Sequence, residues 1–172
     1  MLTTHLDSLD APALRALLQS GGAQSVNTKL DDGRLPLHHA IENGSAADSA
    51  AALEIVRCLL DFDADPTSLD EDGQGTALHV VAGSLAREPG FALPCLRLLL
   101  DWMPTPLDLD TLLDAEGNTP MAVAVQQGKQ LGAGDPATQQ AAEDAVVSGV
   151  KTLLSHGSGL LQYAPAAKRG KK

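Results

Sequence analysis

One short phrase recurs three times along the chain, and each copy follows an acidic turn that contains glycine. The copies are Leu35–Ala40, Thr76–Val81 and Thr119–Ala124. Their third residues, Leu37, Leu78 and Met121, are separated by 41 and 43 residues. Periods of roughly 20–50 residues are typical of stacked-repeat proteins, in which neighbouring units bury a continuous core. The spacing therefore predicts a repeat stack, an architecture that presents surfaces and rarely performs chemistry.

A second pattern follows each phrase, and it also precedes the first one. It consists of an apolar residue, a basic residue, a small or apolar residue and two leucines, and it occupies 14–18, 56–60, 96–100 and 150–154. This pattern indicates an amphipathic helix with a broad buried face. We expect its basic residues to lie late in their helices, where a cation complements the helix dipole. They are Arg15, Arg57, Arg97 and Lys151.

The composition supports packed helices. Aromatic residues make up only 2% of the chain, so the core has to be built from alanine, leucine and valine, which suits helix pairs better than a β-sandwich. The predicted fold class is therefore all-α. Cys58 and Cys95 lie in apolar runs without CxxC spacing and are expected to be reduced core residues.

These repeated residues resemble the ankyrin repeat. The family pattern is an acidic residue, glycine, Thr-Pro-Leu-His, alanine and glycine, followed by a helix with paired leucines. The unit that starts at Asp114 matches it best, although Ala122 replaces the histidine; the unit that starts at Asp31 also fits well. In the middle unit Gly75 looks like a one-residue insertion before Thr76. The resemblance implies an all-α helical solenoid with short β-hairpin-like turns between units.

The resemblance also implies a domain organisation. We expect an ankyrin-repeat domain over 1–162 and a basic C-terminal tail over 163–172. The domain is divided into an N-terminal half-repeat cap at about 6–26 and three repeats at about 27–67, 68–110 and 111–160. His38 and His79 occupy the family's structural histidine position, which implies that they tie neighbouring turns together by hydrogen bonds.

The repeats are longer than the roughly 33 residues of a typical ankyrin unit. In all three the surplus lies between the first and second helix, within 45–52, 86–94 and 129–142. Insertions of this kind map to loops on one face of a solenoid, which is often a binding face, and they are also tolerated as neutral surface loops. The alanine-rich stretches 45–52 and 139–147 can instead be read as helix extensions.

Patterns that carry chemistry are scarce. The histidines and cysteines lack the close pairs of a zinc site, and Asp70, Glu71 and Asp72 are not followed by EF-hand spacing. Neither GxSxG nor GxxxxGK[ST] occurs in the chain. We therefore expect a protein that is not an enzyme and has no catalytic residues, no metal and no cofactor. A metal-dependent enzyme is the least favoured interpretation.

In ankyrin proteins the hairpin turns and the first helices form a concave face that binds partner proteins. The partner-binding residues expected on this face are Asp31, Asp32, Arg34, Asp70, Glu71, Asp72, Gln74, Asp114, Glu116 and Asn118. Trp102 and Phe62 occupy equivalent positions and are either apolar anchors for a partner or packing residues between units. The tail offers further contacts through Lys168, Arg169, Lys171 and Lys172.

The resemblance thus implies a non-catalytic protein–protein interaction module, either an adaptor or a small subunit of a larger assembly. It would use an acidic concave and hairpin face together with the lengthened inter-helix loops. The alternative is an acidic escort that shields a basic client, such as a ribosomal or nucleic-acid-binding protein. The net charge of −10 favours basic partners, although it also serves solubility.

The partner and location expectations follow from charge and from the N-terminal residues. We expect protein partners with a basic surface, no membrane association, nucleic-acid contact only through the tail, and a monomeric state. The segment 1–7 has neither lysine nor arginine, so no signal or transit peptide is evident, and no apolar run reaches the length of a membrane span. The expected location is intracellular, in the cytoplasm, the nucleus or both.

Overall fold

The computed structural model describes residues 2–21, 26–44, 48–70, 75–103, 108–129 and 136–156. Its described elements are α-helices and one short 3-10 helix, which confirms the all-α prediction. They are α1 (Leu2–Asp7), α2 (Ala11–Gln19), α3 (Pro36–Gly44), α4 (Ser49–Asp61), α5 (Ala77–Ser84), α6 (Pro89–Trp102), η2 (Leu109–Thr111), α7 (Pro120–Lys129) and α8 (Pro136–Ser155).

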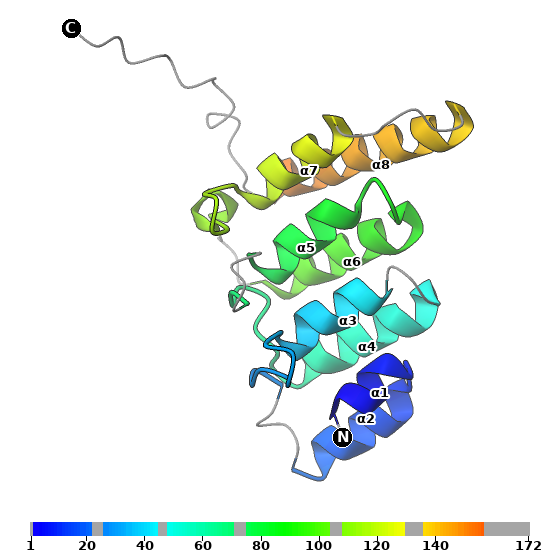
Figure 1. The fold of residues 1–172 in the computed structure, drawn as a ribbon, viewed down its shortest axis with the longest axis vertical. Helices are drawn as coiled ribbons and strands as arrows, with labels where there is room; N and C mark the ends of the chain where they lie inside the picture. Colours follow the sequence, from blue (N-terminus) through cyan, green and yellow to red (C-terminus); the bar gives the residue numbers. More distant parts are fainter. Residues whose placement is uncertain are drawn as a thin grey trace, which may run out of the picture.

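The helices form a stack of pairs (Figure 1). The pairs α1–α2, α3–α4, α5–α6 and α7–α8 follow one another along the long axis. The first helices α1, α3, α5 and α7 contact one another in sequence, and so do the second helices α2, α4, α6 and α8. The chain is therefore a two-layered solenoid, with the turns between units projecting along one edge (Figure 1).

The turns between units share one backbone register. In each turn an N–H near the start donates to a carbonyl near the end, and these bonds are Leu30 to Arg34 (2.8 Å), Asp70 to Gly75 (3.4 Å) and Asp114 to Asn118 (3.0 Å). Arg34, Gly75 and Asn118 are therefore equivalent positions. The extra residue of the middle turn lies between Asp70 and Gly75, so Gly75 is not itself the insertion. Gly33 and Gly117 have φ of 83° and 79°, a backbone region that favours glycine.

The first helices begin where proline and threonine allow them to. Pro36 and Pro120 are the first residues of α3 and α7, where the missing proline N–H costs no hydrogen bond. Before α7, the hydroxyl oxygen of Thr119 accepts the N–H of Ala122 at 3.2 Å.

Two buried histidines tie α3 and α5, respectively, to the turn of the next unit. The Nε2 atoms of His38 and His79 lie 3.0 Å from the carbonyl oxygens of Gly75 and Asn118, respectively. The structural role predicted for both histidines is confirmed. Burial lowers the pKa of His38 and of His79, although the hydrogen bonds to these carbonyls act in the opposite direction. Both imidazoles are therefore held as neutral Nε2–H donors.

The two histidines differ at Nδ1. Nδ1 of His79 lies 3.0 Å from the backbone nitrogen of Thr76 and 2.9 Å from its hydroxyl oxygen, so it accepts hydrogen bonds from both. Nδ1 of His38 is buried without a hydrogen-bond partner. Leu35, which lacks a hydroxyl group, occupies the position of Thr76, so one of the two donors that Nδ1 of His79 has is missing at His38. The same histidine position is thus fully satisfied in one unit and only half satisfied in the unit before it.

Most of the surplus length goes into the second helices. α4, α6 and α8 have 13, 14 and 20 residues, whereas α3, α5 and α7 have 9, 8 and 10. The expectation of a loop over 86–94 is therefore wrong for 89–94, which form the start of α6. Of the alanine-rich stretches, 49–52 and 139–147 are helical, as the helix-extension interpretation predicted. Residues 45–47 and 130–135 lie outside the described part of the chain.

The expectation that the basic residues complement the C-terminal ends of the second helices is wrong, although Arg57, Arg97 and Lys151 do lie in the second halves of α4, α6 and α8. No basic residue lies in the last turn of α2, α4, α6 or α8, so these cations do not complement a helix end. Arg15 instead pairs with Asp61 at 2.7 Å and joins α2 to α4 across the surface. The two side chains are 45% and 32% exposed, so solvent screens this pair and it adds little to stability.

The core is aliphatic, as the composition predicted, and tight packing requires glycine at two places. At Gly44 an added Cβ would lie 2.7 Å from atoms of Ala52 and Phe91, and at Gly149 it would lie 2.4 Å from Leu85. A side chain at position 44 would have to displace Ala52 and the ring of Phe91, and one at position 149 would have to displace the end of the Leu85 side chain. Cys58 and Cys95 are buried free thiols.

Three remaining expectations concern the N-terminal cap, membrane-spanning helices and the C-terminal tail. The N-terminal cap consists of two helices, because α1 lies beside α3 in the first layer, just as α2 lies beside α4 in the second. Within the described ranges, no helix combines the length and the apolar character needed to cross a membrane. The tail over 163–172 lies outside the residues that the structure describes.

Candidate functional site

The exposed face of the first-helix layer changes character along the stack. Leu37, Leu78 and Met121 are equivalent residues of α3, α5 and α7. Two residues after them come His39, Val80 and Val123, respectively. Five residues after them come Glu42, Gly83 and Gln126. α3 therefore presents large polar side chains at positions where α5 presents only valine and glycine. This difference divides the face into a filled part and a hollow part.

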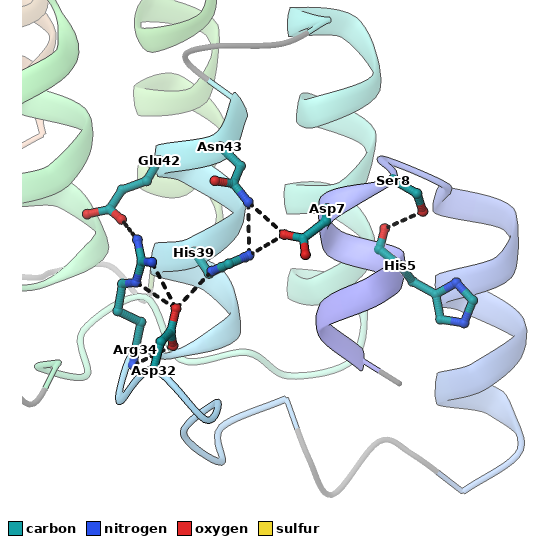
Figure 2. Close-up of polar contacts among 8 residues, drawn as sticks. All are labelled: His5, Asp7, Ser8, Asp32, Arg34, His39, Glu42 and Asn43. Atoms are coloured by element: carbon teal, nitrogen blue, oxygen red, sulfur yellow. Dashed lines mark hydrogen bonds and ion pairs between the residues drawn. The ribbon is translucent and has the colours of Figure 1, made fainter.

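The filled part is a polar network around His39 (Figure 2). His39 lies between two carboxylates, with Nε2 2.8 Å from Asp7 of α1 and Nδ1 3.3 Å from Asp32 of the first turn. Its side chain is only 7% exposed. Asn43 donates to the same Asp7 oxygen at 3.0 Å. The network thus joins α1 of the cap, α3 and the first turn between units.

Arg34 extends this network toward α3. Its guanidinium lies 2.9 Å from Asp32 and also pairs with Glu42 (Figure 2). Partial burial raises the pKa of Asp32, but the hydrogen bonds and positive charge of Arg34 outweigh this, so the pKa lies below its ordinary value. Arg34 thus supplies one positive charge to two carboxylates, so Asp32 and Glu42 are paired within the molecule without being fully neutralised.

The hollow part is a groove of about 630 Å³ over α5, which we call the α5 groove. Val80, Gly83 and Ser84 of α5 line it, together with Val123 and Gln127 of α7. The remaining lining residues are Glu42, His79, Arg87, Asp114 and Glu116. The α5 groove is thus of mixed character: Val80, Gly83 and Val123 form a small apolar part, and polar and charged side chains make up the rest of its lining.

The charges around the α5 groove are mostly negative. Three carboxylates, those of Glu42, Asp114 and Glu116, face a single guanidinium, that of Arg87. Glu116 is exposed, and Asp114 accepts the backbone N–H of Asn118 at 2.7 Å. Asp114 and Glu116 belong to the third turn, whereas Arg87 follows the C-terminal end of α5. A ligand in the groove would therefore meet negative charge at the turn and positive charge at the other end.

The expected site residues that the structure describes differ in their exposure and in their pairing. Asp31 and Glu116 are exposed, Asp70 is buried, and Asp114 bonds within its own turn. Asp32 and Arg34 belong to the His39 network. The side-chain amide of Asn118 donates to Asp114 at 3.0 Å. The expected contacts that lie outside the described residues are Glu71, Asp72, Gln74, Lys168, Arg169, Lys171 and Lys172.

The two equivalent aromatic residues have different environments. Trp102 is the last residue of α6 and remains 46% exposed, whereas Phe62 is partly buried against the core. Phe62 is therefore a packing residue. Trp102 remains a candidate anchor for a partner.

The residues of the α5 groove were not anticipated from the sequence, apart from Asp114 and Glu116. One signal was present in Gly83, since an isolated glycine within a helical pattern costs about 1 kcal/mol relative to alanine. A position-by-position comparison with Glu42 and Gln126 would have exposed the missing side chain. Within the described ranges, no three His, Cys, Asp or Glu side chains are placed to hold a metal ion.

Comparisons with known proteins agree with this architecture. A family model described as ankyrin repeat matches residues 32–71. Among solved structures, the chain is similar to the ankyrin repeat domain of Bcl-3, described as a unique member of the IkappaB protein family, with a TM-score of 0.59 and 25% sequence identity. That match covers 92% of this chain and 72% of the Bcl-3 chain. No curated protein matches the chain in sequence.

Proposed function

We propose that this chain, which is an ankyrin-repeat protein, is a non-catalytic protein–protein interaction module whose partner presents a basic surface. It would act as an adaptor or as a small subunit of a larger assembly. Ankyrin repeats are in general protein–protein interaction modules, and this supports the assignment of an interaction module. The basic character of the partner rests on the charges of this particular chain.

One observation carries the proposal: the hollow part of the first-helix face is bordered by carboxylates and lies beside an exposed turn. Glu116 is exposed at the α5 groove, and Asp31 is exposed on the first turn. A cationic partner would approach these groups without first breaking a strong internal pair. Complementary charge of this kind accelerates association and selects the partner. The net charge of −10 repels acidic competitors over a longer range.

Charge reversal at these two residues tests the proposal. Tagged full-length wild type and an Asp31→Lys/Glu116→Lys variant are incubated with cell extract at about 50 mM and about 500 mM salt, and the captured proteins are identified by mass spectrometry. We expect wild type to retain proteins of high isoelectric point at low salt only, because the screening length falls from roughly 14 Å at the low salt concentration to roughly 4 Å at the high one. The double variant should lose them.

The matched control is Glu54→Lys/Glu143→Lys, which reverses two charges on the second helices α4 and α8. It should capture the same proteins as wild type. Capture that survives high salt and both charge reversals would refute the electrostatic proposal and favour apolar anchoring through Trp102. The escort alternative predicts in addition that the captured proteins bind nucleic acid and precipitate less readily in the presence of this chain.

A further inference from the structure

Glycine at position 83 is not required by the fold. Gly83 lies within α5, and its φ is outside the left-handed region. An added Cβ would meet only Val123, at 3.7 Å, which is an ordinary van der Waals contact. Gly44 and Gly149 differ, because a Cβ there would clash at 2.7 and 2.4 Å. Glycine in a helix costs roughly 0.5–1 kcal/mol relative to alanine, so Gly83 weakens α5 without a packing benefit.

What Gly83 does provide is the depth of the α5 groove. The equivalent residues in the neighbouring units are Glu42 and Gln126, whose long side chains occupy the surface of the layer. Val80 and Ser84, next to Gly83 on the same face, are also small. The groove therefore exists because three neighbouring positions of α5 lack large side chains. It exposes a strip of apolar and backbone surface that a ligand main chain can approach closely.

The two ends of the α5 groove carry opposite charges, and these define the direction in which a ligand lies. Asp114 and Glu116 lie at the third turn, and Arg87 lies beyond the end of α5. Eight helical residues span about 12 Å, which corresponds to about four residues of an extended chain. A short extended segment therefore reaches both ends at once.

We propose that the α5 groove binds an extended segment of a partner protein, with a lysine or arginine side chain against Asp114 and Glu116, small residues over Gly83, and a carbonyl or carboxylate toward Arg87. This inference rests on the proposed function and narrows it to one surface and one ligand class. A cation is favoured at the turn because two carboxylates lie there, only one of which is held by Asn118. An arginine can bind a carboxylate through two parallel hydrogen bonds.

The test uses a phage-displayed library of random dodecapeptides, selected on the full-length wild-type chain. The dissociation constants of the selected peptides, labelled with fluorescein, are then measured by fluorescence polarisation. Gly83→Leu fills the groove, and Gly90→Leu is its matched control, because Gly90 is an exposed helical glycine whose Cβ would meet nothing within 4 Å. We expect peptides enriched in lysine or arginine, a loss of affinity of at least tenfold in Gly83→Leu, and no change in Gly90→Leu. Thermal melting shows whether both variants remain folded.

Glu116→Lys and a charge-neutral tail distinguish the remaining outcomes. Basic peptides that weaken with Glu116→Lys but bind Gly83→Leu as well as wild type would overturn the groove assignment while leaving the proposed acidic surface standing. Peptides without basic residues would overturn both. In a full-length variant with the four tail cations replaced by serine, unchanged affinity supports a partner as the occupant. An affinity increase of at least tenfold would overturn that assignment, because the chain's own tail would then be the occupant.

Discussion

The two buried histidines that join neighbouring units, His38 and His79, offer a sharp test of how much local hydrogen bonding stabilises this stack. His38 and His79 have the same register and comparable burial, so replacing either by alanine leaves a similar cavity. His79 makes three hydrogen bonds, two to Thr76 and one to Asn118, whereas His38 makes one, to Gly75. The difference between the two substitutions therefore isolates the contribution of the bonds at Nδ1.

The magnitude follows from these contacts. His79→Ala leaves the buried N–H of Thr76 without its acceptor and removes the hydroxyl bond, at about 1 kcal/mol net for each bond and up to about 3 kcal/mol for an orphaned buried group. His38→Ala removes a buried nitrogen that already has no partner, and this offsets part of its cost. We expect His79→Ala to be more destabilising than His38→Ala by about 2 kcal/mol or more.

Urea unfolding measures this difference. The transition is followed by circular dichroism and by the fluorescence of Trp102, the only tryptophan. At a slope of about 2 kcal/mol/M, the midpoints of the two variants should differ by about 1 M. Thr76→Val, which removes only the hydroxyl bond, should lie between wild type and His79→Ala. Equal midpoints, or a lower midpoint for His38→Ala, would refute the reasoning and show that packing outweighs the bonds at Nδ1.

Three further predictions follow. Burial lowers the pKa of His38 and His79, so below about pH 6.5 the unfolded state binds more protons than the folded state. The free energy of unfolding should therefore fall as the pH is lowered. Urea midpoints measured at pH 7.5 and 5.5 should differ more in wild type than in His79→Gln. Burial also raises the pKa of Cys58, and that of Cys95 to about 12. Both thiols should therefore react with a thiol-specific reagent only after unfolding. Rapid reaction of either thiol in the native protein would contradict its burial. Asp63 has φ of 64°, where glycine has no steric penalty, so Asp63→Gly should raise stability by about 0.5–1 kcal/mol in thermal melts, and a lower melting temperature would show that the aspartate side chain is needed.

The fold was predictable because its determinants are local and repeated. Pro36 and Pro120 mark helix starts, Gly33 and Gly117 mark turns, and each has the same physical role wherever it recurs. His38 and His79 were predicted correctly because the family resemblance assigns them a contact one unit away. Repetition fixes the distance between units, so a contact across units becomes predictable in the same way as a local one.

The candidate site was only partly predictable. Asp31, Asp70 and Glu116 are similar in sequence as acidic turn residues, yet Asp70 is buried and the other two are exposed. The surplus segments also looked like loops, whereas 89–94 form the first residues of α6. Exposure and helix length depend on what the neighbouring unit places opposite, and a pattern within one unit does not contain that information.

The sequence by itself therefore determined the architecture: a stack of helix pairs and where the first helices α3, α5 and α7 begin. With the family resemblance, it also determined which histidines join the units. The tertiary structure alone decided where the stack is hollow. Gly83 is one small residue among many in the sequence, and it lines a groove only because Val80, Ser84 and Val123 surround it and Glu42 flanks it. The physical reason is that a helix is specified by its own residues, whereas a cavity is specified by side chains that several helices bring together or leave out.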